Sequence, residues 1–175
     1  MNLNVEVQVL EIGFGTGLNA ILTLEKSSTL KQPTFFHTLE PYPVEKEIWT
    51  QLTYAEGFSL QTEWRSMHES KWNDVHQLSP LFKFKKEKQR IEDIVLENNK
   101  YHVVYFDGFA PQKQVDIWSL ENLQKVFNAM RNNAIMVTYT AQAELRKQLV
   151  QIGFVVEILK GPPGKKEMTL ARKVL

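Results

Sequence analysis

The amino-acid sequence predicts an α/β fold, with a doubly wound, mostly parallel sheet that ends in an antiparallel hairpin. Short apolar segments typical of strands alternate with segments of helical spacing, the pattern of a parallel sheet covered on both faces. No helical segment separates the last two apolar segments, so these two strands must pair as a hairpin. The length of 175 residues, without a repeat or a linker, fits a single domain spanning residues 1–175.

The first half of the chain predicts two strands and two helices. Residues 7–12 are mostly apolar, as expected for a strand that is buried on both faces of a sheet. Apolar residues at helical spacing follow from residue 18 onward. Residues 35–39 form a second short apolar strand, and apolar residues between 44 and 52 then mark one face of a helix.

The middle of the chain has a weaker pattern. Residues 53–84 show no clear period, and we expect their tryptophans, Trp64 and Trp72, to fill a core rather than to stack on RNA bases. The window 83–90 contains five basic residues and one acidic residue, which is typical of an edge strand protected by lysines. Asp93 is expected to follow a third strand and to precede a short helix.

The second half repeats the alternation of strand and helix. Residues 103–106 and 135–139 are apolar strands, and a helical stripe over residues 120–130 lies between them. A second helix face over residues 145–152 stops at Gly153, which fits a C-terminal cap. The two strands of the final hairpin are residues 154–159 and 168–172.

Composition excludes several classes of site. The chain contains no cysteine, which excludes disulfides, thiolate metal sites and cysteine nucleophiles. No apolar run approaches the ~20 residues of a membrane span, and the start lacks the basic region of a signal peptide, so we expect a soluble cytoplasmic protein. The net charge of +1 argues weakly against a large nucleic-acid contact. The four histidines lack a metal-ligand spacing, so no metal site is expected.

Glycines at alternate positions, Gly13, Gly15 and Gly17, follow the first predicted strand and precede a helix. They allow a tight turn and a close approach to a ligand, and the helix offers its N-terminal amides. The third glycine comes one residue earlier than in the G-x-G-x-x-G fingerprint of dinucleotide sites. Glu11 would repel a pyrophosphate but can bind the ammonium of a methionine moiety. The turn therefore favours S-adenosylmethionine as the ligand, and a plain strand–helix turn is the alternative.

Two further carboxylates lie where a nucleoside could meet them. Glu40 ends the second predicted strand and can accept hydrogen bonds from both hydroxyls of a ribose. A solvated glutamate before a proline turn is the alternative. Asp93 can accept a hydrogen bond from an adenine amino group or can act as a helix N-cap.

The segment from Asp107 to Pro111, with the sequence DGFAP, leaves the fourth predicted strand at its carboxyl end. Doubly wound sheets place their active sites at this end. A carboxylate at Asp107 can accept hydrogen bonds from an incoming amine and align it with a methyl group. The alternative is a turn formed by Asp107 and Gly108.

Several motifs together resemble the methyltransferase domain of the MnmC family, whose bifunctional members make 5-methylaminomethyl-2-thiouridine at the tRNA wobble position. The motifs are GFGTGLN at residues 13–19, FDGFAP at 106–111 and DIW at 116–118. The resemblance implies a Rossmann-like class I methyltransferase fold. It also implies transfer of a methyl group from S-adenosylmethionine to the exocyclic amine of 5-aminomethyl-(2-thio)uridine in tRNA.

The residue patterns and this resemblance together give expected roles for individual residues. The expected cofactor contacts are Glu11, Gly13, Gly15, Gly17, Asn19, Glu40, Asp93 and Asp107. Asp107 would also be the catalytic residue, because it would meet the substrate amine. Phe109 and Pro111 would form walls of the base pocket. Lys165 and Lys166, at the predicted hairpin turn, could anchor a stem of the tRNA whose anticodon loop is the substrate, or could form a solvated turn.

The family pattern also differs from this sequence at two points. Members carry several dozen residues before the first strand, so we expect that an N-terminal segment is missing here. The sequence contains no second dinucleotide fingerprint, so we expect a stand-alone form without the oxidase half. The alternatives are a small-molecule N- or O-methyltransferase, a non-catalytic cofactor-binding module, and a nicotinamide oxidoreductase, which the glycine spacing disfavours.

Overall fold

The computed structural model describes residues 5–53, 57, 59–109, 114–161 and 163–174. Within these residues the strands, in chain order, are β1 (Val7–Ile12), β2 (Thr34–Leu39), β3 (Val75–Ser79), β4 (Phe82–Glu87), β5 (Tyr101–Phe106), β6 (Met130–Thr138), β7 (Phe154–Lys160) and β8 (Glu167–Lys173). The helices are α1 (Leu18–Leu30), α2 (Lys46–Trp49), α3 (Gln61–Glu69), the 3-10 helix η2 (Asp116–Trp118), α4 (Leu120–Ala129) and α5 (Ala143–Ile152).

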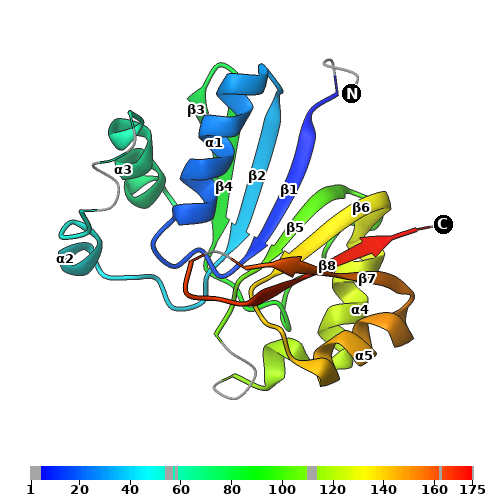
Figure 1. The fold of residues 1–175 in the computed structure, drawn as a ribbon. Coiled ribbons are helices and arrows are strands. Elements are labelled where there is room, and N and C mark those ends of the chain that lie inside the picture. The colour runs from blue at the N-terminus through cyan, green and yellow to red at the C-terminus, as the bar shows by residue number, and fades with distance from the viewer. Residues whose placement is uncertain (1–4, 54–56, 58, 110–113, 162, 175) are drawn as a thin grey trace. The chain divides into compact units, whose positions relative to one another are not determined.

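The described strands form an eight-stranded sheet with the hydrogen-bonded order β3-β4-β2-β1-β5-β6-β8-β7 (Figure 1). The pairs β2–β4, β1–β5 and β5–β6 are parallel. β8 lies between β6 and β7 and runs antiparallel to both. This topology confirms the predicted α/β class, the mostly parallel sheet and the antiparallel hairpin near the end of the chain.

The chain divides into two compact units, and unit 1 comprises residues 1–8 and 13–90. In unit 1, α1 packs along β2 and β4 (Figure 1). The ring of Phe36 on β2 stacks on the rings of Phe82 and Phe84 on β4, with centroids 6.0 and 6.1 Å apart. The alternation of phenylalanine and lysine in β4 directs these aromatic rings to a buried face. The core of unit 1 is therefore largely aromatic.

The expectation that residues 83–90 form an edge strand is wrong. β4 pairs with β2 on one side and with β3 on the other, so β3 occupies the edge. One lysine of the window, Lys86, is only 1% exposed. Its neighbours Lys83 and Lys85 form ion pairs with Glu6 and Glu87, respectively.

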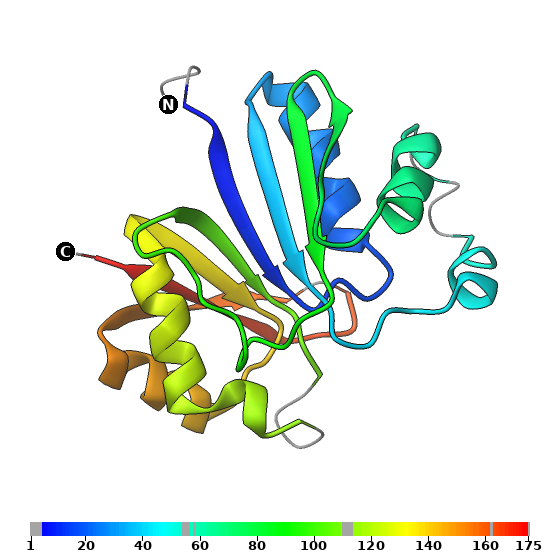
Figure 2. The same ribbon diagram turned by 180° about the vertical axis from the view of Figure 1, so that it is seen from behind.

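Unit 2 comprises residues 9–12 and 91–175. Its helices α4 and α5 lie next to each other and contact β6 and β7, respectively (Figure 2). α5 ends at Gly153, which has a φ of 114° and confirms the predicted C-terminal cap. Phe127 of α4 packs edge-on against Phe154 of β7. None of the helices in the described residues is both long and apolar enough to cross a lipid bilayer.

Two sequence-based expectations about helices differ from the structure. The helix expected between residues 44 and 52 is the short α2, in which Ile48 is exposed and Trp49 supplies the buried contact. No helix follows Asp93, because buried Ile94 and Leu96 alternate with exposed residues at the period of an extended chain. Asp93 is therefore not a helix N-cap.

Candidate functional site

The glycine-rich turn of unit 1 has the shape of a ligand cradle. Gly13, Gly15 and Gly17 all have positive φ, at 96°, 51° and 78°. Gly17 is the N-cap of α1. The ring of Phe14 fills the space beside it, since a Cβ at Gly17 would lie 3.1 Å from that ring. A Cβ at Gly15 would meet nothing within 4 Å. The backbone at Gly15 thus borders open space, as close approach by a ligand requires.

The carboxylate of Glu40 holds this turn in place. Glu40 directly follows β2 and is 9% exposed. Its Oε2 accepts a hydrogen bond from the backbone N–H of Gly15 at 2.9 Å, and its Oε1 accepts one from the N–H of Tyr42 at 2.9 Å. A carboxylate has about four acceptor sites, so both oxygens can still accept hydrogen bonds from a ligand. The structure therefore brings together Gly15 and Glu40, which the sequence predicted separately.

Two residues of α3, Trp64 and His68, also contact this turn, and the sequence did not predict the contact for either of them. The indole Nε1 of Trp64 donates to the carbonyl oxygen of Thr16 at 2.9 Å. The imidazole Nε2 of His68 lies 3.1 Å from the same oxygen. Trp64 is 2% exposed and belongs to the core, as expected. The spacing of four residues, which places both side chains on one helix face, was the signal available in the sequence.

In unit 2, the segment Asp107–Phe109 follows β5 and is held at successive backbone groups. The N–H of Asp107 donates to the carbonyl of Ile12 at 2.9 Å. The hydroxyl of Tyr139 donates to the carbonyl of Gly108 at 3.0 Å, and Trp118 Nε1 donates to the carbonyl of Phe109 at 2.8 Å. The backbone of this segment is thereby fixed, although the side chains of Asp107 and Phe109 are exposed.

The phenol of Tyr139 connects this segment with the loop between β7 and β8. Burial, followed by the nearby negative charge of Asp107, raises the pKa of Tyr139 above its usual value. The phenol therefore stays protonated and can donate its hydrogen bond at neutral pH. The ammonium of Lys165 lies 3.9 Å from the centroid of the Tyr139 ring, a cation–π contact. Lys166, the other predicted tRNA contact, is exposed on the same loop.

The remaining predicted site residues of the described part belong to β1, to α1 and to a turn after β4. Glu11 is fully buried in β1, opposite Tyr105 of β5. Asn19 is the second residue of α1, and Asp93 is exposed in a turn. Pro111 lies outside the described residues. Unit 1 thus holds Gly13, Gly15, Gly17, Asn19 and Glu40, and unit 2 holds Glu11, Asp93, Asp107, Phe109, Lys165 and Lys166.

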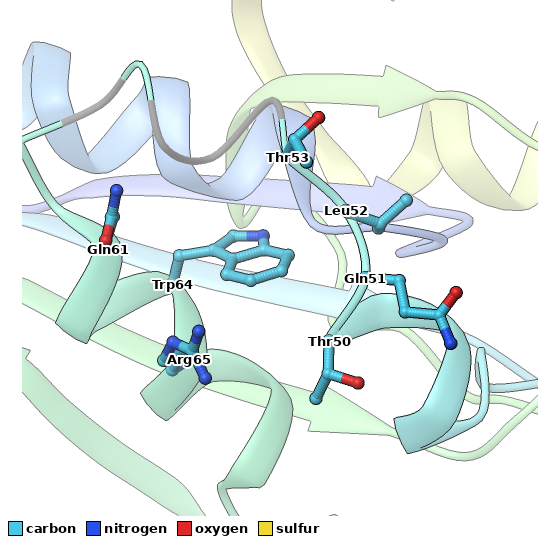
Figure 3. Close-up of a pocket in the computed structure, with 7 residues that line it drawn as sticks. All are labelled: Thr50, Gln51, Leu52, Thr53, Gln61, Trp64 and Arg65. Carbon is cyan, nitrogen blue, oxygen red and sulfur yellow. The ribbon is translucent and has the colours of Figure 1, made fainter.

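A pocket of about 300 Å³ lies beside α3 in unit 1 (Figure 3). It is lined by Thr50, Gln51, Leu52, Thr53, Gln61, Trp64 and Arg65. None of the predicted site residues lines it, although Trp64 also contacts the glycine-rich turn. In the described part of the chain, no three histidine, aspartate or glutamate side chains group in a way that could hold a metal ion.

The chain is similar to a methyltransferase family and to proteins named MnmC. A family described as S-adenosyl-L-methionine-dependent methyltransferase matches residues 58–174. The tRNA 5-methylaminomethyl-2-thiouridine biosynthesis bifunctional protein MnmC of Nitrosospira multiformis is 29% identical over 172 residues, which cover 90% of this chain and 27% of that protein. The protein of the same name from Campylobacter hominis is 30% identical over 176 residues, which cover 94% of this chain and 25% of that protein.

Among solved structures, MNMC2 from Aquifex aeolicus has a similar fold, with a TM-score of 0.70 and 20% identity. The match covers 95% of this chain and 53% of that chain. This likeness agrees with the predicted Rossmann-like fold. The chain spans about a quarter of the length of the MnmC proteins that it matches.

Proposed function

This chain belongs to the S-adenosyl-L-methionine-dependent methyltransferase family, and from this premise we propose that it methylates the exocyclic amine of 5-aminomethyl-(2-thio)uridine at the wobble position of tRNA. The observation that carries the proposal is the exposed carboxylate of Asp107 on a segment whose backbone is fixed by Tyr139 and Trp118. The likeness to MnmC proteins over nine-tenths of the chain favours tRNA as the substrate and the cytoplasm as the place of action.

The residues of unit 1 fit a nucleoside cofactor. The space at Gly15 admits a ligand to the backbone, and the nearly buried carboxylate of Glu40 has acceptor sites for ribose hydroxyls. When bound, S-adenosylmethionine supplies a methyl group on a positively charged sulfur. Glu11, Asn19 and Asp93 remain predicted contacts, with the ammonium of the methionine moiety assigned to Glu11 and the adenine amino group assigned to Asp93.

Asp107 has the central role in the proposed chemistry. Its carboxylate accepts a hydrogen bond from the substrate amine, which orients the nitrogen lone pair and lowers the entropic part of the barrier. As the N–C bond forms, the methyl–sulfur bond would break and leave a neutral thioether. Asp107 would accept the proton that the nitrogen loses or pass it to water. Phe109, with 64% of its surface exposed, and Pro111 cover the uracil base. Lys165 and Lys166 contact tRNA phosphates.

Transfer of tritium from labelled S-adenosylmethionine tests this function. The purified chain is incubated with tRNA from cells that lack this methylation and, separately, with a small-molecule extract from the same cells. We expect label in the tRNA, and nuclease digestion should place it in the methylaminomethyl nucleoside. Label in the extract alone would establish a small-molecule methyltransferase instead. Cofactor binding without any transfer would indicate a non-catalytic binding module.

A further inference from the structure

The carbonyl oxygen of Thr16 receives two hydrogen bonds from one helix. Trp64 and His68 lie one turn apart on α3, and their ring nitrogens lie 2.9 and 3.1 Å from this oxygen. A carbonyl oxygen only accepts hydrogen bonds, so Nε2 of His68 must carry a proton. Two side chains of α3 therefore fix the direction of a single peptide group in the glycine-rich turn.

The imidazole that contacts Thr16 is held in a dense aromatic cluster. The His68 ring stacks on Trp49 at 4.6 Å and lies 4.8 and 5.0 Å from the rings of Trp64 and Phe14. Burial lowers the pKa of His68 to about 4, so the imidazole is neutral at physiological pH. A Cβ at Gly17 would lie 3.3 Å from its Nε2, which shows that the turn packs directly on this ring.

Lys86 of β4 holds the backbone of His68, whose side chain makes the contact with Thr16. Its ammonium, which is almost completely buried, donates to the backbone carbonyl of His68 at 2.5 Å, near the C-terminus of α3. A cation at this end of a helix satisfies one of the last carbonyls and interacts favourably with the helix dipole. The backbone of His68 is thus bonded to the sheet while its side chain contacts the turn.

The peptide group that these residues hold is part of the ligand-facing turn. The Thr16 carbonyl and the Gly17 N–H belong to one rigid plane, and that N–H donates to the carbonyl of Phe14 at 2.9 Å. Glu40 holds the N–H of Gly15 separately. The turn is therefore fixed at two successive residues, by a carboxylate at Gly15 and by α3 at Thr16.

We propose that Trp64 and His68 are positioning residues that keep the glycine-rich turn in the shape that binds the cofactor. This inference rests on the use of S-adenosylmethionine but not on the identity of the methyl acceptor. A turn that is already ordered before binding loses less entropy when the ligand arrives, so these residues increase cofactor affinity without touching the cofactor.

Isothermal titration calorimetry with S-adenosylmethionine and with its demethylated product tests the proposal on the full chain. Trp64→Phe keeps an aromatic ring but removes the N–H donor, and we expect a Kd about fivefold higher, the effect of one neutral hydrogen bond. Trp49→Phe is the matched control, because Trp49 belongs to the same cluster and forms no hydrogen bond with Thr16. Both variants lose the same side-chain volume, but only Trp64→Phe removes the donor to Thr16. The Kd of Trp49→Phe should therefore stay within about twofold of that of the unaltered chain.

Variants of His68 give a readout that loss of packing alone would not produce. His68→Gln retains an N–H donor and should bind the cofactor nearly as well as the unaltered chain, whereas His68→Leu should lose about fivefold. If Trp64→Phe fails to fold, this pair provides the same comparison. Equal Kd values for Trp64→Phe and the unaltered chain, or equal losses in Trp64→Phe and Trp49→Phe, would overturn the proposal. Absence of binding by the unaltered chain would instead overturn the use of the cofactor.

Discussion

The glycine-rich turn in unit 1 and the Asp107–Phe109 segment in unit 2 are fixed in different ways. The turn is held at an N–H by Glu40 and at a carbonyl by Trp64 and His68. Glu40 and Trp64 are buried, and His68 is half-buried. The segment is held through its own backbone groups, which leaves its acidic and aromatic side chains exposed. The first arrangement suits a turn that keeps one shape for a ligand, and the second suits chemistry by a side chain.

Replacement of Asp107 should have the largest effect on either region. Asp107→Ala is expected to lower kcat for tRNA methylation at least ~100-fold, since a general base or orienting carboxylate typically contributes that much. The Kd for S-adenosylmethionine should change little. Radiolabel transfer and calorimetry on the same preparation measure the two quantities. Equal losses of cofactor binding and transfer would mean that Asp107 acts mainly on the cofactor.

At Glu40 we expect the reverse, with a larger effect on the Kd for the cofactor than on the transfer step. Glu40→Ala removes the acceptor of the Gly15 and Tyr42 N–H groups and should raise the Kd for the cofactor about tenfold or more. The free energy of unfolding should fall by about 2 kcal/mol. Calorimetry and urea unfolding measure these effects. Glu40→Gln keeps one acceptor oxygen, so its Kd for the cofactor should lie between those of Glu40→Ala and the unaltered chain. An unchanged Kd in both variants would contradict the assigned role.

A smaller effect is expected from Tyr139→Phe, which removes the hydroxyl that holds Gly108 but keeps the ring under Lys165. We expect kcat to fall about fivefold, because one hydrogen bond that fixes the Asp107 segment is lost. Steady-state kinetics with saturating cofactor measure this change. Lys165→Met leaves the Tyr139 hydroxyl in place and should instead raise KM for tRNA. A fall in kcat with Lys165→Met alone would reverse this assignment.

The last expected effect concerns the pH dependence of stability that arises from His68 and not the activity. Its pKa in the folded chain, about 4, is lower than the ordinary 6.5, so the unfolded chain takes up the proton first as pH falls. The contribution of His68 to stability is therefore complete above pH 6.5 and decreases toward pH 4. Urea unfolding at several pH values should show a weaker acid dependence in His68→Gln. Equal pH dependence in both chains would place the proton uptake on other groups.

Much of the fold could be predicted because its strands differ clearly from the rest of the sequence. The apolar segments at β1, β5 and β6 correspond to inner strands, each with a hydrogen-bonded strand on both sides. α3 and β4 could not be predicted reliably. α3 has only Trp64 and Met67 as buried residues, and β4 contains a buried lysine whose favourable contact depends on a helix carbonyl.

The candidate site could be predicted only in part, for a physical reason. Residues that follow a strand within a few positions, such as Gly15, Glu40 and Asp107, are recognisable by their place near a strand end. The residues that hold them come from elements distant in the sequence, as Trp64 does for the turn and Tyr139 for the Asp107 segment. Their hydrogen bonds go to backbone carbonyls, which exist at every residue and leave no pattern in the sequence.

The insertion of β8 between β6 and β7 also determines the order in which unit 2 can be completed during translation. β7 is synthesised before β8, yet its hydrogen-bonded neighbour in the described sheet is β8. Until Glu167–Lys173 has left the ribosome, the facing edges of β6 and β7 have no strand to pair with. A nascent chain that stalls before this segment would expose two open edges, and such edges promote aggregation.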